Sequence, residues 1–299
     1  VEPGNLEVEA VAERVSALLA VLDAVVELKQ LDPLISFAGL ITTPLEPAAL
    51  VSGGGSLWLH DAEQGRVFRI DQQGQFEPVE VYRAGAEYAG LLAAAPIALN
   101  WDQAGERLLL IDAERQLWSI ADAVSAVPLV LRGVDQLGSV TSIAAYVSNL
   151  YVLDSTSGEV WRYLPAGDGY DSERSGLLGG IDLPEATGLA VDGDVYVLDG
   201  GTVRRFRQGE EQASLLIGID RLPESPSGLT EDVIRALVYV ADRGNHRIVV
   251  ADRDGLFLRQ YRHPDFDDLR AIALSADGET LYVLSSDGIS SFDAIAVTQ

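Results

Sequence analysis

The sequence predicts an all-β fold, a six-bladed β-propeller. Three observations support it: a repeated strand, a constant spacing between repeats, and hairpin turns within each repeat. The repeated strands are aliphatic and mostly end in Asp, at 57–61, 108–112, 150–154, 195–199, 238–242 and 281–285. Their last residues lie 51, 42, 45, 43 and 43 residues apart. A period of roughly 40–50 residues is typical of propeller blades.

The fourth repeat shows most clearly how a blade is built. Its first strand, 187–191, turns at Asp192-Gly193-Asp194 into a second strand. Asp-Gly between apolar runs is a strong hairpin signal. A third strand at 203–206 and an outer strand at 214–217 complete the expected four.

The last repeat has too little chain for four strands. After residue 288 only one more strand fits before the chain ends at Gln299. The segment 34–40 precedes the first repeat and resembles the outer strands, so we expect it to pair with the last blade and close the ring. The expected propeller domain is 34–299.

Residues 1–33 are expected to form a helix and a linker. Apolar residues from Val8 to Val25 recur with helical spacing over 5–31, which predicts an amphipathic helix. The apolar stretch is shorter than the roughly 20 residues that span a bilayer. The helix either packs on its own propeller, mediates a homodimer, or leads to a membrane anchor outside this sequence.

The charge balance limits the partners. The 299 residues include 21 Lys and Arg against 46 Asp and Glu, a net charge of −25. Direct binding to nucleic acid or anionic membranes is therefore not expected. Hydrophobic residues make up 47% of the chain, enough for a packed core, and the absence of Cys excludes disulfides and thiolate chemistry. The expected partner is a protein or a small ligand.

The fifth repeat resembles an NHL-type repeat. The resemblance rests on residues 238–250, Val-Tyr-Val-Ala-Asp-Arg-Gly-Asn-His-Arg-Ile-Val-Val, followed by Asp252-Arg253-Asp254-Gly255. It implies an NHL-like propeller of the interaction or sensor kind, similar to the extracytoplasmic sensor propellers of bacterial kinases. The chain begins at Val1 and contains no Met, so we expect a piece of a larger bacterial protein. The compartment stays open, although the resemblance favours the extracytoplasmic part of a membrane-anchored protein.

The repeated aspartates are expected to be structural. An Asp at a strand end accepts hydrogen bonds from nearby backbone N–H groups, and each blade has such a turn. Positions spread around a ring do not converge at the roughly 2.3–2.6 Å distances of one calcium site. No metal or cofactor is therefore predicted. The five residues are Asp61, Asp112, Asp154, Asp199 and Asp242.

No catalytic constellation is evident in the sequence. His60, His246 and His263 have no metal-ligand spacing, and there is no Gly-x-Ser-x-Gly motif. The leading hypothesis is a non-enzymatic ligand-binding, protein-binding or sensory module. The alternatives are a metal-dependent, lactonase-like hydrolase at the mouth of the central channel, as the resemblance to six-bladed lactonases suggests, and a purely structural assembly unit.

Binding is expected at loops on one face, since propellers present their variable loops there. The candidate binding residues are Tyr88, Asp135, Arg221, Arg243, His246, Asp265 and Phe266.

Overall fold

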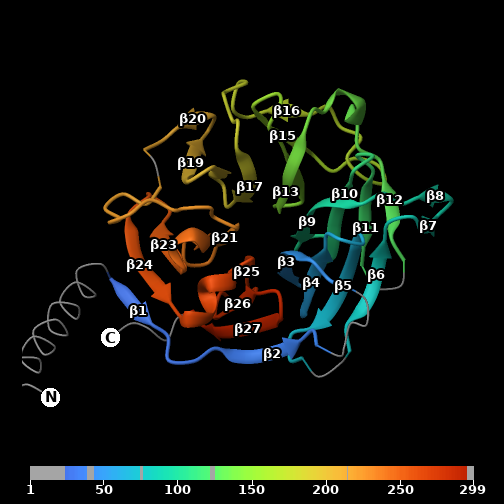
Figure 1. Cartoon of the computed structure of the whole chain (residues 1–299). Helices are drawn as coiled ribbons and strands as arrows, with labels where there is room; N and C mark the ends of the chain where they lie inside the picture. The colour runs from blue at the N-terminus through green and yellow to red at the C-terminus, as the bar shows by residue number, and fades with distance from the viewer. Residues whose placement is uncertain (1–23, 39–43, 75–76, 122–124, 214, 295–299) are drawn as a thin grey trace, which may run out of the picture.

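The computed structural model describes residues 24–38, 44–74, 77–121, 125–213 and 215–294. Within these residues, six sheets are arranged as blades around a central axis (Figure 1). Successive strands of each blade pair antiparallel, and the innermost strands of neighbouring blades contact one another around the whole ring. The prediction of an all-β, six-bladed propeller is confirmed.

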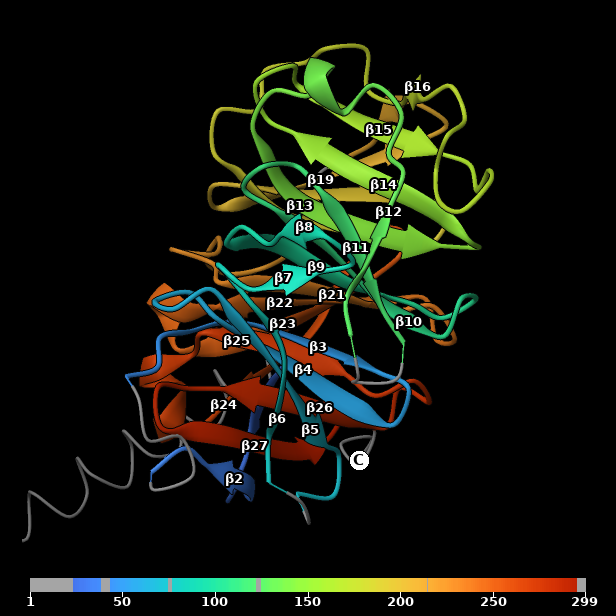
Figure 2. The ribbon, with the colours of Figure 1, turned by 90° about the vertical axis from the view of Figure 1, so that its right-hand side faces the viewer.

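The first three blades each follow the chain from the axis outward. The first consists of β3 (Pro47–Gly53), β4 (Ser56–Asp61), β5 (Arg66–Asp71) and β6 (Val79–Arg83). The second consists of β9 (Pro96–Asp102), β10 (Arg107–Asp112), β11 (Leu117–Ile120) and β12 (Val127–Leu129). The third consists of β13 (Val140–Tyr146), β14 (Asn149–Asp154), β15 (Glu159–Tyr163) and β16 (Ser175–Gly176). Figure 2 shows these three blades one above another.

The last three blades include the two N-terminal strands. The fourth consists of β17 (Ala186–Val191), β18 (Val195–Asp199), β19 (Thr202–Arg207) and β20 (Glu210–Glu211). The fifth consists of β21 (Gly228–Asp232), β22 (Leu237–Asp242), β23 (Arg247–Asp252) and β24 (Phe257–Arg262), with β1 (Val25–Glu27) outside. The sixth consists of β25 (Ala271–Leu274), β26 (Thr280–Leu284), β27 (Gly288–Asp293) and β2 (Asp32–Ser36).

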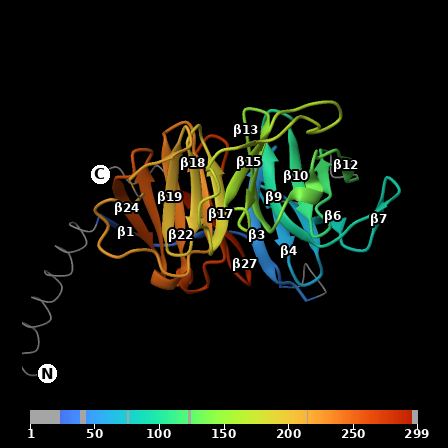
Figure 3. The same ribbon diagram turned by 90° about the horizontal axis from the view of Figure 1, so that it is seen from above.

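Short elements occupy the loops between blades. A small hairpin, β7 (Glu87–Tyr88) and β8 (Leu91–Leu92), projects between the first and second blades (Figure 3). The helices of the described residues are three 3₁₀ turns: η1 (Val134–Gln136), η2 (Arg243–Asn245) and η3 (Pro264–Asp268). No helix in the described part of the chain is long and apolar enough to span a membrane.

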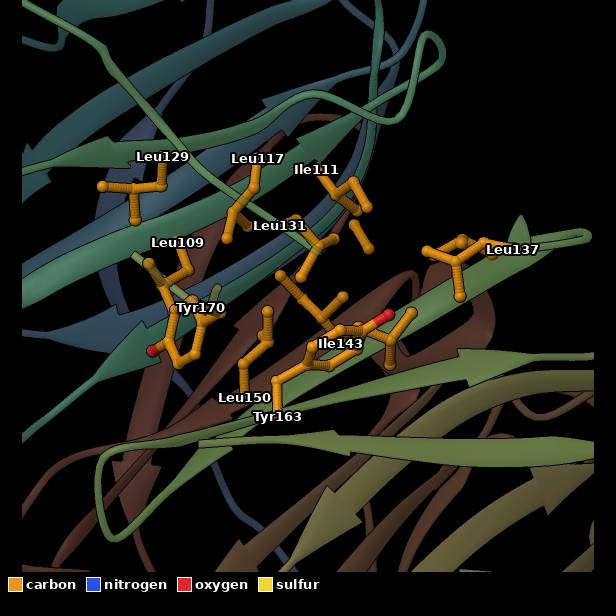
Figure 4. Close-up of a cluster of buried hydrophobic side chains, with 13 residues drawn as sticks. Leu109, Ile111, Leu117, Leu129, Leu131, Leu137, Ile143, Leu150, Tyr163 and Tyr170 are labelled. Atoms are coloured by element: carbon orange, nitrogen blue, oxygen red, sulfur yellow. The ribbon is translucent and has the colours of Figure 1, made fainter. Parts of the chain in front are cut away.

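The core is divided among the spaces between blades. Six apolar clusters are present in the described residues, and each joins two neighbouring blades. Between the second and third blades, Leu109 and Leu117 pack with Ile143, Leu150 and other side chains (Figure 4). Burying one such leucine stabilises the fold by about 1.5–3 kcal/mol. This arrangement explains why the repeated strands are apolar on both faces.

Strand β2 forms the outer edge of the sixth blade. It pairs antiparallel with β27, with Asp32 opposite Ser291 and Ser36 opposite Gly288. Ile35 and Phe37 are buried between the sixth and first blades. The sequence placed this strand at 34–40, of which 39–40 lie outside the described residues, and the paired strand begins two residues earlier.

The predicted N-terminal helix is wrong at its C-terminal end. Val25–Glu27 forms β1, which pairs parallel with β24. The exposed edge of β24 offers backbone partners that outweigh the helical apolar spacing. Val26, Leu28 and Leu31 pack against the cluster between the fifth and sixth blades. Residues 5–23 of that predicted helix lie outside the described residues.

The outer strand predicted for the fourth repeat is also wrong. The strand is β20, Glu210–Glu211, and not 214–217. Leu215 and Leu216 are instead buried between the fourth and fifth blades. The Leu215 N–H donates to the Val203 carbonyl oxygen at 3.3 Å, and Ile217 forms an isolated parallel bridge with Leu256. These single contacts with the fourth and fifth blades do not make an outer strand, so hydrophobicity alone misplaced it.

The five strand-end aspartates anchor the segment that enters their own blade. Each is the last residue of a second strand, and each carboxylate accepts a hydrogen bond from a backbone N–H before the innermost strand. The donors, in order along the chain, are the N–H groups of Glu46, Ala94, Gly138, Glu185 and Glu224, at 2.9, 3.1, 2.9, 3.0 and 2.7 Å.

Arginine completes this contact in three blades. Arg66, Arg204 and Arg247 each lie five residues after the Asp with which they form an ion pair. The fifth-blade pair is fully buried, with 2.7 Å between Arg247 Nε and Asp242 Oδ2. The Asp199–Arg204 pair is longer, 3.4 Å, and its side chains are 13% and 20% exposed.

We expect Asp242→Ala to destabilise the protein by about 3–5 kcal/mol, because the change leaves a buried guanidinium without its main partner. Asp199→Ala, at the equivalent but more exposed position, should cost about 1–2 kcal/mol. Urea unfolding measures both. Equal losses from the two substitutions would contradict the assignment of the larger effect to the buried ion pair.

We also expect removal of β2 to weaken the ring. A chain starting at residue 39 loses the buried side chains of Ile35 and Phe37 and exposes the edge of β27. It should be about 3–6 kcal/mol less stable than a chain starting at residue 31, which also lacks β1 but keeps β2. Thermal and urea unfolding of the two chains give the comparison. Indistinguishable unfolding midpoints would show that β2 does not hold the sixth blade.

Candidate functional site

The ring has two faces that differ in their loops. Because the strands of a blade alternate in direction, the turns from each innermost strand to the second strand lie on one face, the hairpin face. The segments that enter each blade lie on the opposite face, the inter-blade face. The candidate binding residues belong to segments of the inter-blade face.

Two of the candidate residues meet in a shallow pocket on the inter-blade face. Arg243 and His246 line a pocket of about 510 Å³ that also includes Asp267. His246 Nδ1 lies 3.1 Å from an Asp267 carboxylate oxygen, and Arg243 Nη2 lies 3.8 Å from Asp268. Nearby acidic groups thus already engage both basic side chains.

The neighbouring candidates are held by structural contacts. Arg221 donates a hydrogen bond to Asn245 Oδ1 at 3.1 Å, and the backbone N–H of Asp265 donates to His263 Nδ1 at 3.2 Å. Phe266, another candidate binding residue, is not at the surface. Its side chain is fully buried, because it fills the space between the fifth and sixth blades.

Tyr88 and Asp135 belong to other inter-blade segments. Tyr88, in β7, stacks on Tyr82 with ring centroids 5.5 Å apart, and its hydroxyl accepts a hydrogen bond from the Arg83 N–H at 3.0 Å. Asp135 is an exposed residue of η1. Figure 1 shows the β7–β8 hairpin across the ring from β24, so the predicted set does not form one site.

The central channel forms a cavity with a volume of about 780 Å³. All six innermost strands line it, and most of the lining side chains are small or apolar. The strand-end aspartates are not among the lining residues. The described lining contains three carboxylates, those of Asp102, Glu231 and Asp232, and no Lys, Arg or His.

Glu231 occupies a distinctive place in this channel. It lies in β21 opposite Val238, the second residue of β22. At the equivalent register, the other five innermost strands have uncharged residues: Ser52, Trp101, Ala145, Val191 and Leu274. Equivalent strand positions lie at the same height in a propeller, so Glu231 is the charged member of one ring of side chains.

The three channel carboxylates differ in their partners. Asp102 accepts a hydrogen bond from Arg107 Nε at 3.1 Å, and Asp232 accepts one from Arg235 Nη1 at 3.0 Å. No basic side chain in the described residues lies within ion-pair distance of Glu231. Desolvation raises the pKa of Glu231 to about 8; a hydrogen bond from its own backbone N–H opposes the shift, and repulsion from Asp192 adds to it.

Three exposed apolar side chains lie at the mouth of the channel on the hairpin face, in the turns after β13 and β21. Val147, Val233 and Ile234 line the channel and are 70%, 47% and 68% exposed. Val147 and Ser148 make a two-residue turn with φ of 48° and 63°. A β-branched residue at positive φ is rare and strained. Such strain often marks a functional segment, so the rim is a candidate for contact with an apolar ligand.

The sequence repeat marks strand ends and loops, so it did not point to the residues that line the channel. The available signal was an acidic residue in the innermost strand of the fifth repeat, where the other repeats have none at that register. Trp101 was missed similarly: it lines the channel and stacks on Trp58, with centroids 5.8 Å apart. Among the described residues, no group of three or more His, Asp or Glu side chains is placed to hold a metal ion.

Fold and channel together define a β-propeller with an axial cavity, and comparisons with solved structures agree on the fold. A streptogramin B lyase matches with a TM-score of 0.57 and 11% identity, over 88% of this chain and 96% of that one. A gluconolactonase from Xanthomonas campestris matches with a TM-score of 0.61 and 16% identity, over 88% and 95%. Nidogen, in complex with laminin, matches with a TM-score of 0.57 and 14% identity, over 77% and 84%.

These likenesses show the fold alone, because all three identities are low. No protein-family model matches the chain, and no curated protein matches its sequence. The similar structures include enzymes and a protein captured with a binding partner, so they do not decide between catalysis and binding.

His60 makes stability depend on pH. This residue of β4 is buried, and burial lowers its pKa to about 4, although Asp61 opposes the shift. Between pH 6.5 and about 4 the unfolded chain binds a proton that the folded chain does not, so the free energy of unfolding falls as pH falls. The expected loss from His60 is about 3 kcal/mol.

His60→Gln should remove this part of the pH dependence. Urea unfolding at several pH values across this window measures the slope. If the free energy of unfolding of the His60 variant depends on pH as steeply as that of the wild type, protonation of carboxylates and not of His60 causes the loss of stability in acid.

Proposed function

We propose that this protein is a non-enzymatic binding module that takes a small ligand into its central channel from the hairpin face. The observation that carries the proposal is the channel itself, a cavity of about 780 Å³ with mostly small and apolar walls, a few polar groups and an apolar rim. Pockets with this balance of apolar surface and sparse polar groups are typical ligand sites.

Several finer features extend this proposal. The NHL-like fifth repeat and the acidic surface favour a sensory or protein-binding module of a larger bacterial protein. We propose an extracytoplasmic position for this module. We also propose that its N-terminal segment mediates a homodimer through a helix. Strand β2 is proposed to close the ring. Nucleic acid and anionic membranes are not expected partners. Of the loop candidates, Arg243 and His246 are proposed as a secondary contact surface.

The alternative is a hydrolase, lactonase-like and metal-dependent, that works at the channel. One observation favours it: a carboxyl group with a pKa near 8 can act as a general acid or base near neutral pH. The proposal of a binding module rests on the absence, among the described lining residues, of a nucleophile paired with a base or of a grouped metal-ligand set.

Filling the channel tests the binding proposal. Ala145 lies in the same ring of positions as Glu231, so Ala145→Phe should occlude the channel at that height. In ligand-observed NMR with a fragment library, we expect wild-type protein to bind fragments that the filled variant does not. Ala113→Phe, an exposed substitution between β10 and β11, is the matched control and should bind like wild type.

The same preparations separate binding from hydrolysis. We expect no lactone or ester turnover from purified protein, with or without added calcium or zinc. Turnover that depends on a stoichiometric metal and is lost in Glu231→Gln would contradict the proposed binding module and support the hydrolase. Identical fragment binding by wild type and Ala145→Phe, both shown folded by circular dichroism, would overturn the channel as the site.

A further inference from the structure

We propose that the channel selects organic cations, in which an amine or quaternary ammonium group is joined to an apolar body and lies beside Glu231. This inference rests on the proposed function and gives the chemical class of its ligand.

The charge inventory of the channel supports this choice. Asp102, Glu231 and Asp232 are the charged residues of the described lining, and all are acidic. Asp102 and Asp232 already have arginine partners outside the lining, whereas Glu231 faces the cavity. A net charge of −25 adds a negative field that attracts cations into a narrow cavity. An anionic ligand would meet repulsion and no compensating donor.

The surroundings of Glu231 leave its charge uncompensated. The innermost strands on either side, β17 and β25, contain no ionisable residue. Asp192, in the turn after β17, is bound to Arg253 at 2.8 Å. Asp232, next along β21, is bound to Arg235. A ligand cation is therefore the missing partner for this carboxyl group.

An organic cation fits better than a metal ion. Calcium requires six to eight oxygen ligands, and zinc about four donors. Glu231 supplies one carboxyl, and the described residues contain no grouped set of acidic or histidine ligands. Most of the other lining side chains are small or apolar, and the rings of Trp101 and Tyr146 are among them. Aromatic rings attract ammonium groups, and apolar walls bury the rest of the molecule.

Binding should be coupled to the release of a proton. In the empty channel the Glu231 carboxyl, with a pKa of about 8, is mostly protonated at pH 7, and it ionises when the cation arrives. Affinity for the cation should therefore rise about tenfold from pH 6 to pH 7. A neutral ligand should show no such dependence.

The test uses three phenylalkyl probes of similar size that differ in their polar group: 4-phenylbutylamine, 4-phenylbutan-1-ol and 4-phenylbutyrate. We expect the full-length protein to bind the amine most tightly in isothermal titration calorimetry, with a proton released at pH 7. Glu231→Gln should weaken amine binding by about tenfold or more and abolish proton release. Glu279→Gln, an exposed change near the hairpin face with the same effect on net charge, should alter affinity less than about twofold.

The outcomes separate the inference from the proposed function. Tighter binding of the alcohol or the butyrate, or an unchanged amine affinity in Glu231→Gln, overturns the cation inference. If that alcohol or butyrate binding is lost in Ala145→Phe, the channel still binds ligands and the proposed function stands. Absence of amine binding in the wild type also overturns the inference, and the fragment comparison then decides the proposed function separately.

Discussion

The propeller depends on a carboxylate at the end of the second strand in five blades. Each accepts a hydrogen bond from the backbone that leads into its own innermost strand, at 2.7–3.1 Å. The contact sets where the chain enters the blade. In the sixth repeat Ser285 replaces Asp, and Asp268, from the entering segment, accepts a hydrogen bond from the Ser286 N–H at 2.7 Å. The bond direction is reversed, but the same two segments are joined.

Apolar burial then turns oriented blades into a ring. A single four-stranded blade has two apolar faces, and each is covered only when a neighbour is present on both sides. The six clusters between blades therefore distribute the core around the axis. The axis itself stays open, because the innermost strands approach with mainly small side chains such as Ala49 and Ala145. The channel follows from this packing.

An open, mostly apolar axis makes any charge inside it costly. Glu231 is such a charge: desolvation raises the pKa of its carboxyl, repulsion from Asp192 adds to the shift, and no basic side chain of the described residues lies within ion-pair distance. The buried strand-end aspartates are compensated by backbone N–H donors, whereas Glu231 has no basic partner among the described residues. A residue whose position is unfavourable for the stability of the fold often has a functional role.

The repeat period, the hairpin turns and the strand-end aspartates were readable from the sequence, since each depends on residues close together in the chain. The six-bladed architecture followed from them. The sequence did not reveal β1, which replaced the end of a predicted helix because β24 offered an open edge, nor the burial of Phe266 between two blades. It also did not reveal the channel site. Glu231 lies far along the chain from Trp101 and Ala145, and only closure of the ring brings their shared register to one height around the axis.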